Sequence, residues 1–255
     1  MSRLNRLSAS AIRSMFSSET DESIIMLIEI EDPVTNTVSE MFATSDEVRL
    51  VNITNYNIDD NLIFSSTYGG LTAGRTYYVV NINYSTSRVQ LSTTPRGSVV
   101  NITATGSVSN ITVKRVIRIA DSWLERLDYT TTDEVIYGVK STISSFERQF
   151  IFIPVEVQLP QESESGETSC RLVVNYVTSE MIELIRSSLN KPASTKIELV
   201  LSSSPNYVEA EFSNFFISNV SYNATQITFE LNMISYSREP FPAFNFTPIY
   251  FPGLF

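Results

Sequence analysis

The chain is organised around the stretch RLVVNYVTSEMIELIRSSLNKPASTKIELVL, which runs from Arg171 to Leu201. Apolar and β-branched residues at its two ends predict strands over Arg171–Val177 and Thr195–Leu201. Between them, three apolar side chains recur at the spacing of one helical face: Ile182, Ile185 and Leu189. The stretch therefore predicts a strand, a helix and a second strand in succession.

Residues that favour helix ends bracket this predicted helix. Thr178 or Ser179 can cap the first turn by accepting a backbone N–H hydrogen bond, and Glu180 lies near the positive end of the helix dipole. Asn190 tolerates the left-handed conformation after the last turn, and Pro192 prevents continuation. We expect this helix to close the open end of a sheet or barrel, with strands on either side.

Composition excludes several classes of partner. The 255 residues are enough for one large domain or two small ones, and the formal net charge of −10 argues against nucleic acid and anionic membranes. The segment from Glu19 to Glu47 holds nine carboxylates and no Lys or Arg, which indicates either solvated surface or an electrostatic docking region. No apolar run reaches membrane-spanning length, and the N-terminus lacks the apolar core of a secretion signal. We expect neither a nucleic-acid partner nor a membrane anchor.

Residues that carry chemistry are sparse. The chain has no histidine, the commonest general base and zinc ligand, and its one cysteine, Cys170, opens an apolar strand as a small buried side chain. The glycines at 69, 70 and 74 lack the ending of a phosphate loop, and the acidic loop 160–168 lacks the residue order of a calcium loop. The sequence thus predicts no catalytic residue, metal site or cofactor, and not an enzyme. The enzymatic alternative is a hydrolase with two carboxylates far apart in sequence.

An amphipathic helix is predicted over residues 2–18, SRLNRLSASAIRSMFSS. Leu4, Leu7, Ala11 and Met15 lie near one face of that helix. The segment carries arginine and no acid, and we expect it to be a docking helix. Leu4, Leu7 and Met15 are therefore candidate interface residues.

Short strands and turns alternate from about Val38 to Lys114. Five of the eight glycines fall in this region. Strand patterns recur about every ten residues, at Thr76–Ile82, Arg88–Ser92, Val99–Thr103 and Asn110–Arg115, and then at Val116–Ile119. This pattern predicts a small all-β module over residues 38–115, inserted into a larger domain formed by residues 1–37 and 116–255.

Strong strand patterns also flank the module. Ser23–Glu31 and Phe146–Leu159 alternate in polarity, with Pro154 expected at an edge or bulge. Asn214–Tyr222 and Ile227–Met233 alternate on either side of a short turn, which predicts a hairpin. The predicted fold is mainly β with a minor α part: a β-barrel or β-sandwich domain with one packed helix and an N-terminal helix, plus the inserted module.

The C-terminal arm is EPFPAFNFTPIYFPGLF, Glu239–Phe255, which holds four prolines, five phenylalanines and one tyrosine. Proline excludes it from a sheet interior, and so many aromatic side chains are costly to leave in water. It either folds back onto its own domain or lies on a neighbouring subunit. On the second interpretation, the interface residues are Phe241, Phe244, Phe246, Tyr250, Phe251 and Phe255.

Four segments in order resemble a family of bacteriophage tail proteins catalogued as a domain of unknown function: FIFIPVEVQLP, RLVVNYVTSEMIELIRSSL, KIELVLSSSPNYVE and the closing EPFPAFNFTPIYFPGLF. The resemblance covers Val116–Phe255 well and Ser2–Pro33 loosely. More loosely, the layout is similar to the N-terminal part of the minor tail protein L of phage lambda, whose cysteine-rich cluster region has no counterpart here. The segment from Gly69 to Gly106 resembles a small β module that recurs in virion proteins of environmental phages.

The resemblance implies a structural virion protein, a tail-tip or baseplate hub component assembled in the host bacterial cytoplasm. It implies other tail proteins as partners (tail tube, distal tail protein, hub or fibre, tape measure) and a ring or trimer of its own copies. Within this class, the alternative is a distal-tail ring that joins tube to tip. In another class, the module binds carbohydrate with Tyr77, Tyr78 and Tyr84 as stacking platforms, although strand alternation places Tyr77 and Tyr78 on opposite faces.

Overall fold

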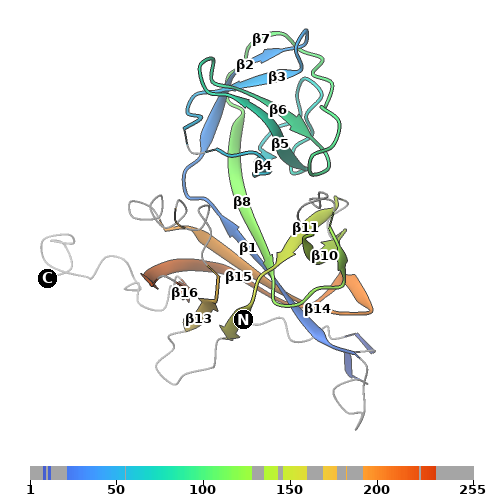
Figure 1. The fold of residues 1–255 in the computed structure, drawn as a ribbon, viewed down its shortest axis with the longest axis vertical. Coiled ribbons are helices and arrows are strands. Elements are labelled where there is room, and N and C mark those ends of the chain that lie inside the picture. Colours follow the sequence, from blue (N-terminus) through green and yellow to red (C-terminus); the bar gives the residue numbers. More distant parts are fainter. Residues whose placement is uncertain are drawn as a thin grey trace, which may run out of the picture.

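The computed structural model describes residues 8–9, 11–12, 22–54, 56–127, 135–142, 146–159, 169–176, 182, 192–223 and 225–233. In this part of the chain, 16 strands form one continuous hydrogen-bonded sheet. Figure 1 shows two lobes, an upper and a lower one, connected by long strands. The predicted mainly β class is therefore confirmed.

The upper lobe contains the turn-rich region of the sequence. Its strands are β2 (Asn36–Phe42), β3 (Glu47–Leu50), β4 (Asn61–Phe64), β5 (Thr76–Asn83), β6 (Arg88–Ser92), β7 (Gly106–Ser107) and the first half of β8 (Thr112–Ala120). Pairing runs β8–β4–β5–β6–β3–β2 and returns to β8, because β2 also pairs with β8. Side chains that alternate inwards form one core drawn from residues 38–113. Phe64 and Tyr77 lie in this core edge to face, with ring centroids 5.7 Å apart.

The lower lobe contains the other strands. They are β1 (Ile24–Glu31), β9 (Glu125–Arg126), β10 (Tyr137–Ser141), β11 (Arg148–Phe152), β12 (Val155–Gln158), β13 (Ser169–Val174), β14 (Ser194–Leu201), β15 (Ser204–Tyr222) and β16 (Ile227–Met233). The order β12–β13–β16–β15–β14–β1–β8 curls into a partial ring, because β11, which directly precedes β12, pairs with β8. Ile28 and Ile30 of β1 pack in the main core of this lobe, whereas Ile25 and Leu27 pack on the opposite face of β1 in a smaller cluster.

Strand β8 belongs to both lobes. Its first half pairs antiparallel with β2 and β4, and its second half pairs antiparallel with β1 and parallel with β11. The predicted strands Asn110–Arg115 and Val116–Ile119 are thus one continuous strand. This strand crosses the proposed boundary at residue 115 without a break. The division into a host domain and an inserted module stays a prediction.

The structure also corrects two other predicted strands. Val99–Thr103 forms no strand and contributes only a bridge between Val99 and Ser92. Phe146–Leu159 is divided into β11 and β12, because the chain leaves the ladder around Pro154, which has no N–H to donate. The predicted hairpin is confirmed by the pairing of β15 with β16, which reaches Tyr222 opposite Ile227.

The two predicted helices, over 178–190 and 2–18, lie largely outside the described residues. Ile182 has helical conformation, as do Ala9, Ala11 and Ile12. Ser8 caps the N-terminal turn, since its Oγ accepts a 3.1 Å hydrogen bond from the Ala11 N–H. The N–H and hydroxyl of Ser8 in turn donate to the Glu209 carboxylate of β15, at 2.7 and 2.5 Å. This turn is therefore bound to the lower lobe of its own chain.

Candidate functional site

The predicted interface residues lie outside the described residues, so they stay predictions: Leu4, Leu7, Met15, Phe241, Phe244, Phe246, Tyr250, Phe251 and Phe255. Cys170 is described and is buried, as predicted. Burial raises the pKa of its thiol to about 11. At neutral pH this side chain is a protonated thiol within the lower-lobe core.

The three tyrosines considered as sugar platforms have different surroundings. Tyr77 and Tyr78 face opposite sides of β5, as predicted, and both are buried. Tyr77 lies in the upper-lobe core, whereas Tyr78 packs against Leu127 of the lower lobe. Tyr84 is 56% exposed, and its hydroxyl donates a 2.9 Å hydrogen bond to the Tyr56 carbonyl oxygen. Two of the three rings are therefore inaccessible to a sugar.

A buried ion cluster lies where the lobes meet. Arg115 of β8 has only 3% of its side chain exposed, and its Nη2 lies 2.9 Å from Asp32 Oδ2. Its Nη1 lies 3.7 Å from Asp60 Oδ2, and the Asp60 side chain is also 3% exposed. Asp32 follows β1 and accepts a 2.8 Å bond from the Val34 N–H, while Asp60 precedes β4 and accepts a 2.9 Å bond from the Asn57 N–H. One guanidinium thus connects β8 with the end of β1 and the start of β4.

A cavity of about 200 Å³ opens beside this cluster, lined by Asp32, Val34, Thr35, Asn36, Thr37, Val51, Asn52, Tyr56 and Arg115. Asn36 organises its polar wall: its Oδ1 accepts bonds from the N–H groups of Thr37 and Asn52, and its Nδ2 donates to the Asn52 carbonyl oxygen. Burial raises the pKa of the Tyr56 phenol above its ordinary value. The cavity therefore has a polar wall whose groups already bond one another, and an exposed apolar rim formed by Val34 and Val51.

A second group of charged side chains connects four strands of the lower lobe. Glu29 of β1 lies 2.6 Å from Arg118 Nε of β8 and 3.7 Å from Arg148 Nη1 of β11. Glu198 of β14 lies 2.9 Å from Arg148 Nη2 and 2.7 Å from Lys196 Nζ. Burial by itself would raise the pKa of Glu29, but the positive charges of Arg118, Arg148 and Lys196 outweigh it and hold that pKa below its ordinary value. These pairs fix the relative positions of the strands around the partial ring.

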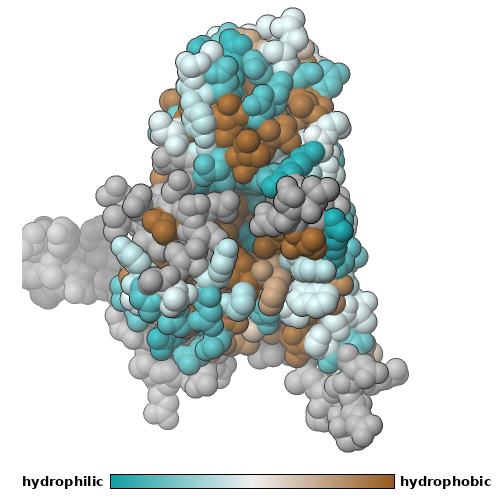
Figure 2. All heavy atoms as spheres, in the orientation of Figure 1, coloured by the Kyte–Doolittle hydropathy of each residue, from teal (hydrophilic) through white to brown (hydrophobic). Residues whose placement is uncertain are grey.

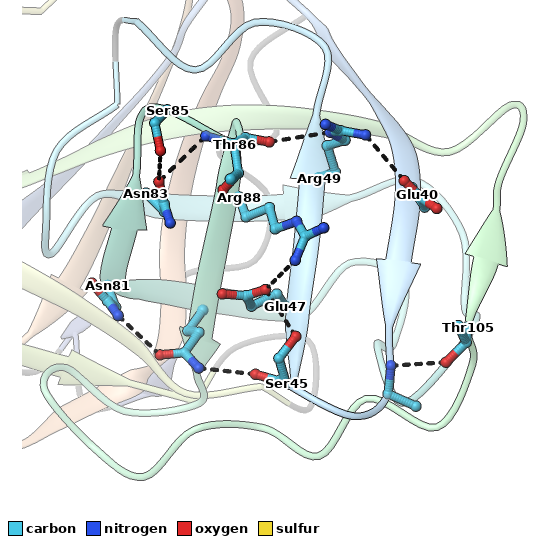
Figure 3. Close-up of polar contacts among 12 residues, drawn as sticks. Glu40, Ser45, Glu47, Arg49, Asn81, Asn83, Ser85, Thr86, Arg88 and Thr105 are labelled. Atoms are coloured by element: carbon cyan, nitrogen blue, oxygen red, sulfur yellow. Dashed lines mark hydrogen bonds and ion pairs between the residues drawn. The ribbon is translucent and has the colours of Figure 1, made fainter.

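Polar side chains cover the outer face of β2, β3, β5 and β6 in the upper lobe, as Figure 3 shows. Arg49 Nη1 lies 3.2 Å from Glu40 Oε2, and its Nε donates a 3.1 Å bond to the Thr86 carbonyl oxygen. Arg88 Nη1 lies 3.0 Å from Glu47 Oε2. Part-exposed pairs of this kind contribute little stability, about 0–1 kcal/mol each. The face presents paired charges and not a field of one sign.

Exposed apolar side chains gather around the β9–β10 hairpin of the lower lobe. Trp123 and Tyr137 are 52% and 44% exposed, and their ring centroids lie 5.0 Å apart at an interplanar angle of 52°. Leu124, which follows Trp123, and Val135, two residues before Tyr137, are 37% and 48% exposed. Figure 2 shows brown, hydrophobic residues near the position of β10 and β11 in Figure 1, but it does not single out Trp123 and Tyr137, because tryptophan and tyrosine are pale on this hydropathy scale. These four residues, here named the Trp123 patch, are the strongest candidate for a contact surface among the described residues.

Within the described ranges, no three His, Cys, Asp or Glu side chains are placed to hold a metal ion together. No helix in the described part of the chain is long and apolar enough to cross a membrane. Among the described residues, the best-supported candidate site is the Trp123 patch, because its two aromatic rings are exposed beside each other.

Sequence reasoning missed both the buried ion cluster and the Trp123 patch. Two arginines within the apolar strand Thr112–Ala120 were the available signal, since a charge inside a buried strand requires a partner. Their partners, Asp32 and Glu29, lie more than eighty residues away and could not be assigned from local spacing. The exposure of Trp123 and its contact with Tyr137 of β10 become apparent only in the structure.

Comparisons of the chain with protein-family models, with curated proteins and with solved structures find no match.

Proposed function

We propose that this protein is a structural component of a bacteriophage tail, placed at the tail tip or baseplate hub. The proposal rests first on the resemblance of the segments between Val116 and Phe255 to a phage tail family. The finer expectation for the fold, a tail domain of barrel or sandwich type that carries an inserted module, belongs to the same proposal. The function is carried by geometry and assembly, without turnover of a substrate.

The observation that carries the proposal is the attachment of the upper lobe to the lower one at two places. The strand β8 runs through both lobes, and Arg115 connects it with Asp32 and Asp60 at the junction. Tyr78 packs against Leu127 as a second, apolar contact between the lobes. A module held at both a strand and a side contact keeps a fixed orientation, which suits a part that projects from a particle.

The partners in this proposal are further copies of the chain and neighbouring tail proteins, such as the tube, the distal tail protein, the fibre or the tape measure. Two arrangements remain within the class. A hub has three copies, whereas a distal-tail ring that joins the tube to the tip has six. Both are closed symmetric assemblies, in which one copy contacts the next through a repeated interface.

Immunogold labelling of intact virions tests the proposal, with antibodies raised against residues 38–115. Label confined to the distal end of the tail is the expected result, and the bead count then separates three copies from six. Label along the whole tail would indicate a tube decoration. Protein found only in infected cells, with no label on intact or disrupted particles, would refute the structural role.

A further inference from the structure

We propose that the Trp123 patch is the binding site for the C-terminal arm, Glu239–Phe255, of a second copy of this chain. The inference rests on the proposed function, because it names the contact through which copies assemble. It concerns the four patch residues Trp123, Leu124, Val135 and Tyr137.

The patch lies on a well-supported hairpin. β9 pairs with β10, with Tyr137 opposite Arg126, and the Leu124 N–H donates a 2.9 Å bond to the Gly138 carbonyl oxygen. Directly after β9, Leu127 is buried against Tyr78. The backbone beneath the aromatic pair is therefore held from two sides, and a partner that binds there orders few further groups.

The apolar residues near the aromatic pair favour a peptide over a sugar, although the exposed Glu125 and Arg126 of β9 lie on the same hairpin, with Arg126 opposite Tyr137. Leu124 and Val135, close to the aromatic pair in sequence, add exposed aliphatic groups to this hairpin. A sugar site needs polar groups that converge on hydroxyls, whereas an apolar peptide site needs exposed rings with aliphatic neighbours. Exposed Trp and Tyr side chains are also the residues that most often dominate the binding energy of protein interfaces.

The arm supplies the matching chemistry. It holds four prolines, five phenylalanines and one tyrosine, with Glu239 as its one charged side chain. Prolines lack an N–H to desolvate and have a restricted φ, and grooves lined by aromatic side chains bind proline-rich segments for this reason. The arm is therefore suited to lie across the exposed rings of Trp123 and Tyr137.

A second copy is the occupant that fits the proposed assembly. The arm and the patch are different surfaces, so a contact between them on successive copies is heterologous, and heterologous contacts generate rings when the rotation closes. The 22 residues that follow Met233 span up to about 70 Å when extended, which is enough to reach a neighbour.

Trp123 is the single tryptophan of the chain, so its fluorescence reports on the patch alone. The full chain is diluted over a wide concentration range while mass is measured by light scattering and the tryptophan emission maximum is recorded. We expect a concentration-dependent assembly with a blue shift of the emission as it forms. A synthetic peptide of residues 239–255 is expected to dissociate the assembly while the blue shift is kept, and a shuffled peptide is expected to do neither.

Two variants make the test specific, and both leave the reporter in place. Tyr137→Ser is expected to weaken assembly by at least about tenfold. Tyr222→Ser, at a tyrosine that is 67% exposed on the β15–β16 hairpin, is the matched control and is expected to assemble normally. Far-UV circular dichroism confirms that each variant is folded.

Several outcomes would overturn the inference. They are an emission maximum that does not respond to assembly, an assembly that tolerates Tyr137→Ser, or a monomer whose emission is blue-shifted at every dilution. A blue shift with host polysaccharide and none with the arm peptide would also overturn it. If the arm binds the patch but the protein is absent from virions, the proposed function fails and this inference stands. If the protein is found in the tail but the patch does not respond, only the inference fails.

Discussion

Replacement of Arg115 by Met is expected to destabilise the protein far more than the same change at its neighbour Lys114. Both residues lie on β8 and both are paired with an acid across the sheet. Arg115 is 3% exposed and lies 2.9 Å from Asp32, which is 9% exposed, whereas Lys114 is 48% exposed and lies 2.8 Å from Glu31, which is 36% exposed. The distances to Asp32 and Glu31 are nearly the same, so the two sites differ mainly in burial and in the second acid, Asp60, which lies 3.7 Å from Arg115.

The magnitudes follow from what each change leaves behind. Loss of Arg115 leaves the Asp32 and Asp60 carboxylates buried without their cation, and breaking a buried pair in this way costs about 3–5 kcal/mol. Loss of Lys114 leaves an exposed glutamate in contact with water, which costs about 0–1 kcal/mol. With a urea slope of about 3 kcal/mol/M, the Arg115→Met midpoint is expected to fall by about 1–1.7 M.

Urea unfolding measures the difference, followed both by far-UV circular dichroism and by the fluorescence of Trp123 so that separate unfolding of the lobes is detected. A third variant adds Asp32→Asn and Asp60→Asn to Arg115→Met. It is expected to recover part of the loss, because the uncompensated charges are removed. The reasoning is refuted if Arg115→Met costs no more than Lys114→Met, or if the triple variant is less stable than Arg115→Met alone.

Three further predictions concern single sites. Cys170, with its pKa raised to about 11, is expected to resist a thiol reagent at pH 8 in the folded protein and to react at once in urea. Gly138→Ala is expected to cost more than about 3 kcal/mol in urea unfolding, because a Cβ there would overlap the Phe150 carbonyl oxygen. Gly74→Ala, which meets no atom but has φ +74°, is the control at about 1–2 kcal/mol. The pKa of Glu29 is lowered in the folded state, so its stabilisation is present above the unfolded pKa, about 4.3, and is lost as pH falls through the folded value. The difference in unfolding free energy between the wild type and Glu29→Gln is therefore expected to shrink below about pH 4; a constant difference down to pH 2 would contradict the assignment.

Local pattern predicted many of the strands, but it predicted no individual strand at the positions of β2, β3, β4, β7 and β9. β1, β5, β6, β14 and the β15–β16 hairpin were expected from alternation and turn residues. The bounds of β1, β5, β6, β14 and β16 differ from the predicted ones by at most one residue, whereas β15 begins at Ser204, ten residues before the predicted start at Asn214. Predictions failed where pairing with a neighbouring strand, and not the β-propensity of the segment itself, decides whether a strand forms. Val99–Thr103 has a strand-like sequence, but Val99 makes only an isolated bridge to Ser92, and the segment stays outside the ladder.

Burial of charge and exposure of aromatic residues could not be predicted in the same way. Tyr77 and Tyr78 were expected on opposite faces, which is correct, but the second lobe that buries Tyr78 was invisible to a pattern within one strand. The buried ion cluster around Arg115 could not be predicted for the same reason, because its members come from distant parts of the chain. Arg115 finds Asp32 because β1 and β8 pair, and this register depends on contacts between residues more than eighty positions apart.

The acidic N-terminal segment shows how strand pairing can neutralise a charge excess that is evident from composition alone. From Glu19 to Glu47 the sequence holds nine carboxylates and no base, which suggested a solvated or docking surface. Of the acids in the described part of this segment, five are paired with bases from later strands: Glu29 with Arg118, Glu31 with Lys114, Asp32 with Arg115, Glu40 with Arg49, and Glu47 with Arg88. Three of the five bases lie on β8, and alternation places Arg115 and Arg118 on its opposite faces. Three of these acids, Glu29, Glu31 and Asp32, thus pair with β8, the strand shared by the two lobes, whereas Glu40 and Glu47 pair within the upper lobe. The acidic segment therefore carries less unpaired negative charge than its composition suggests.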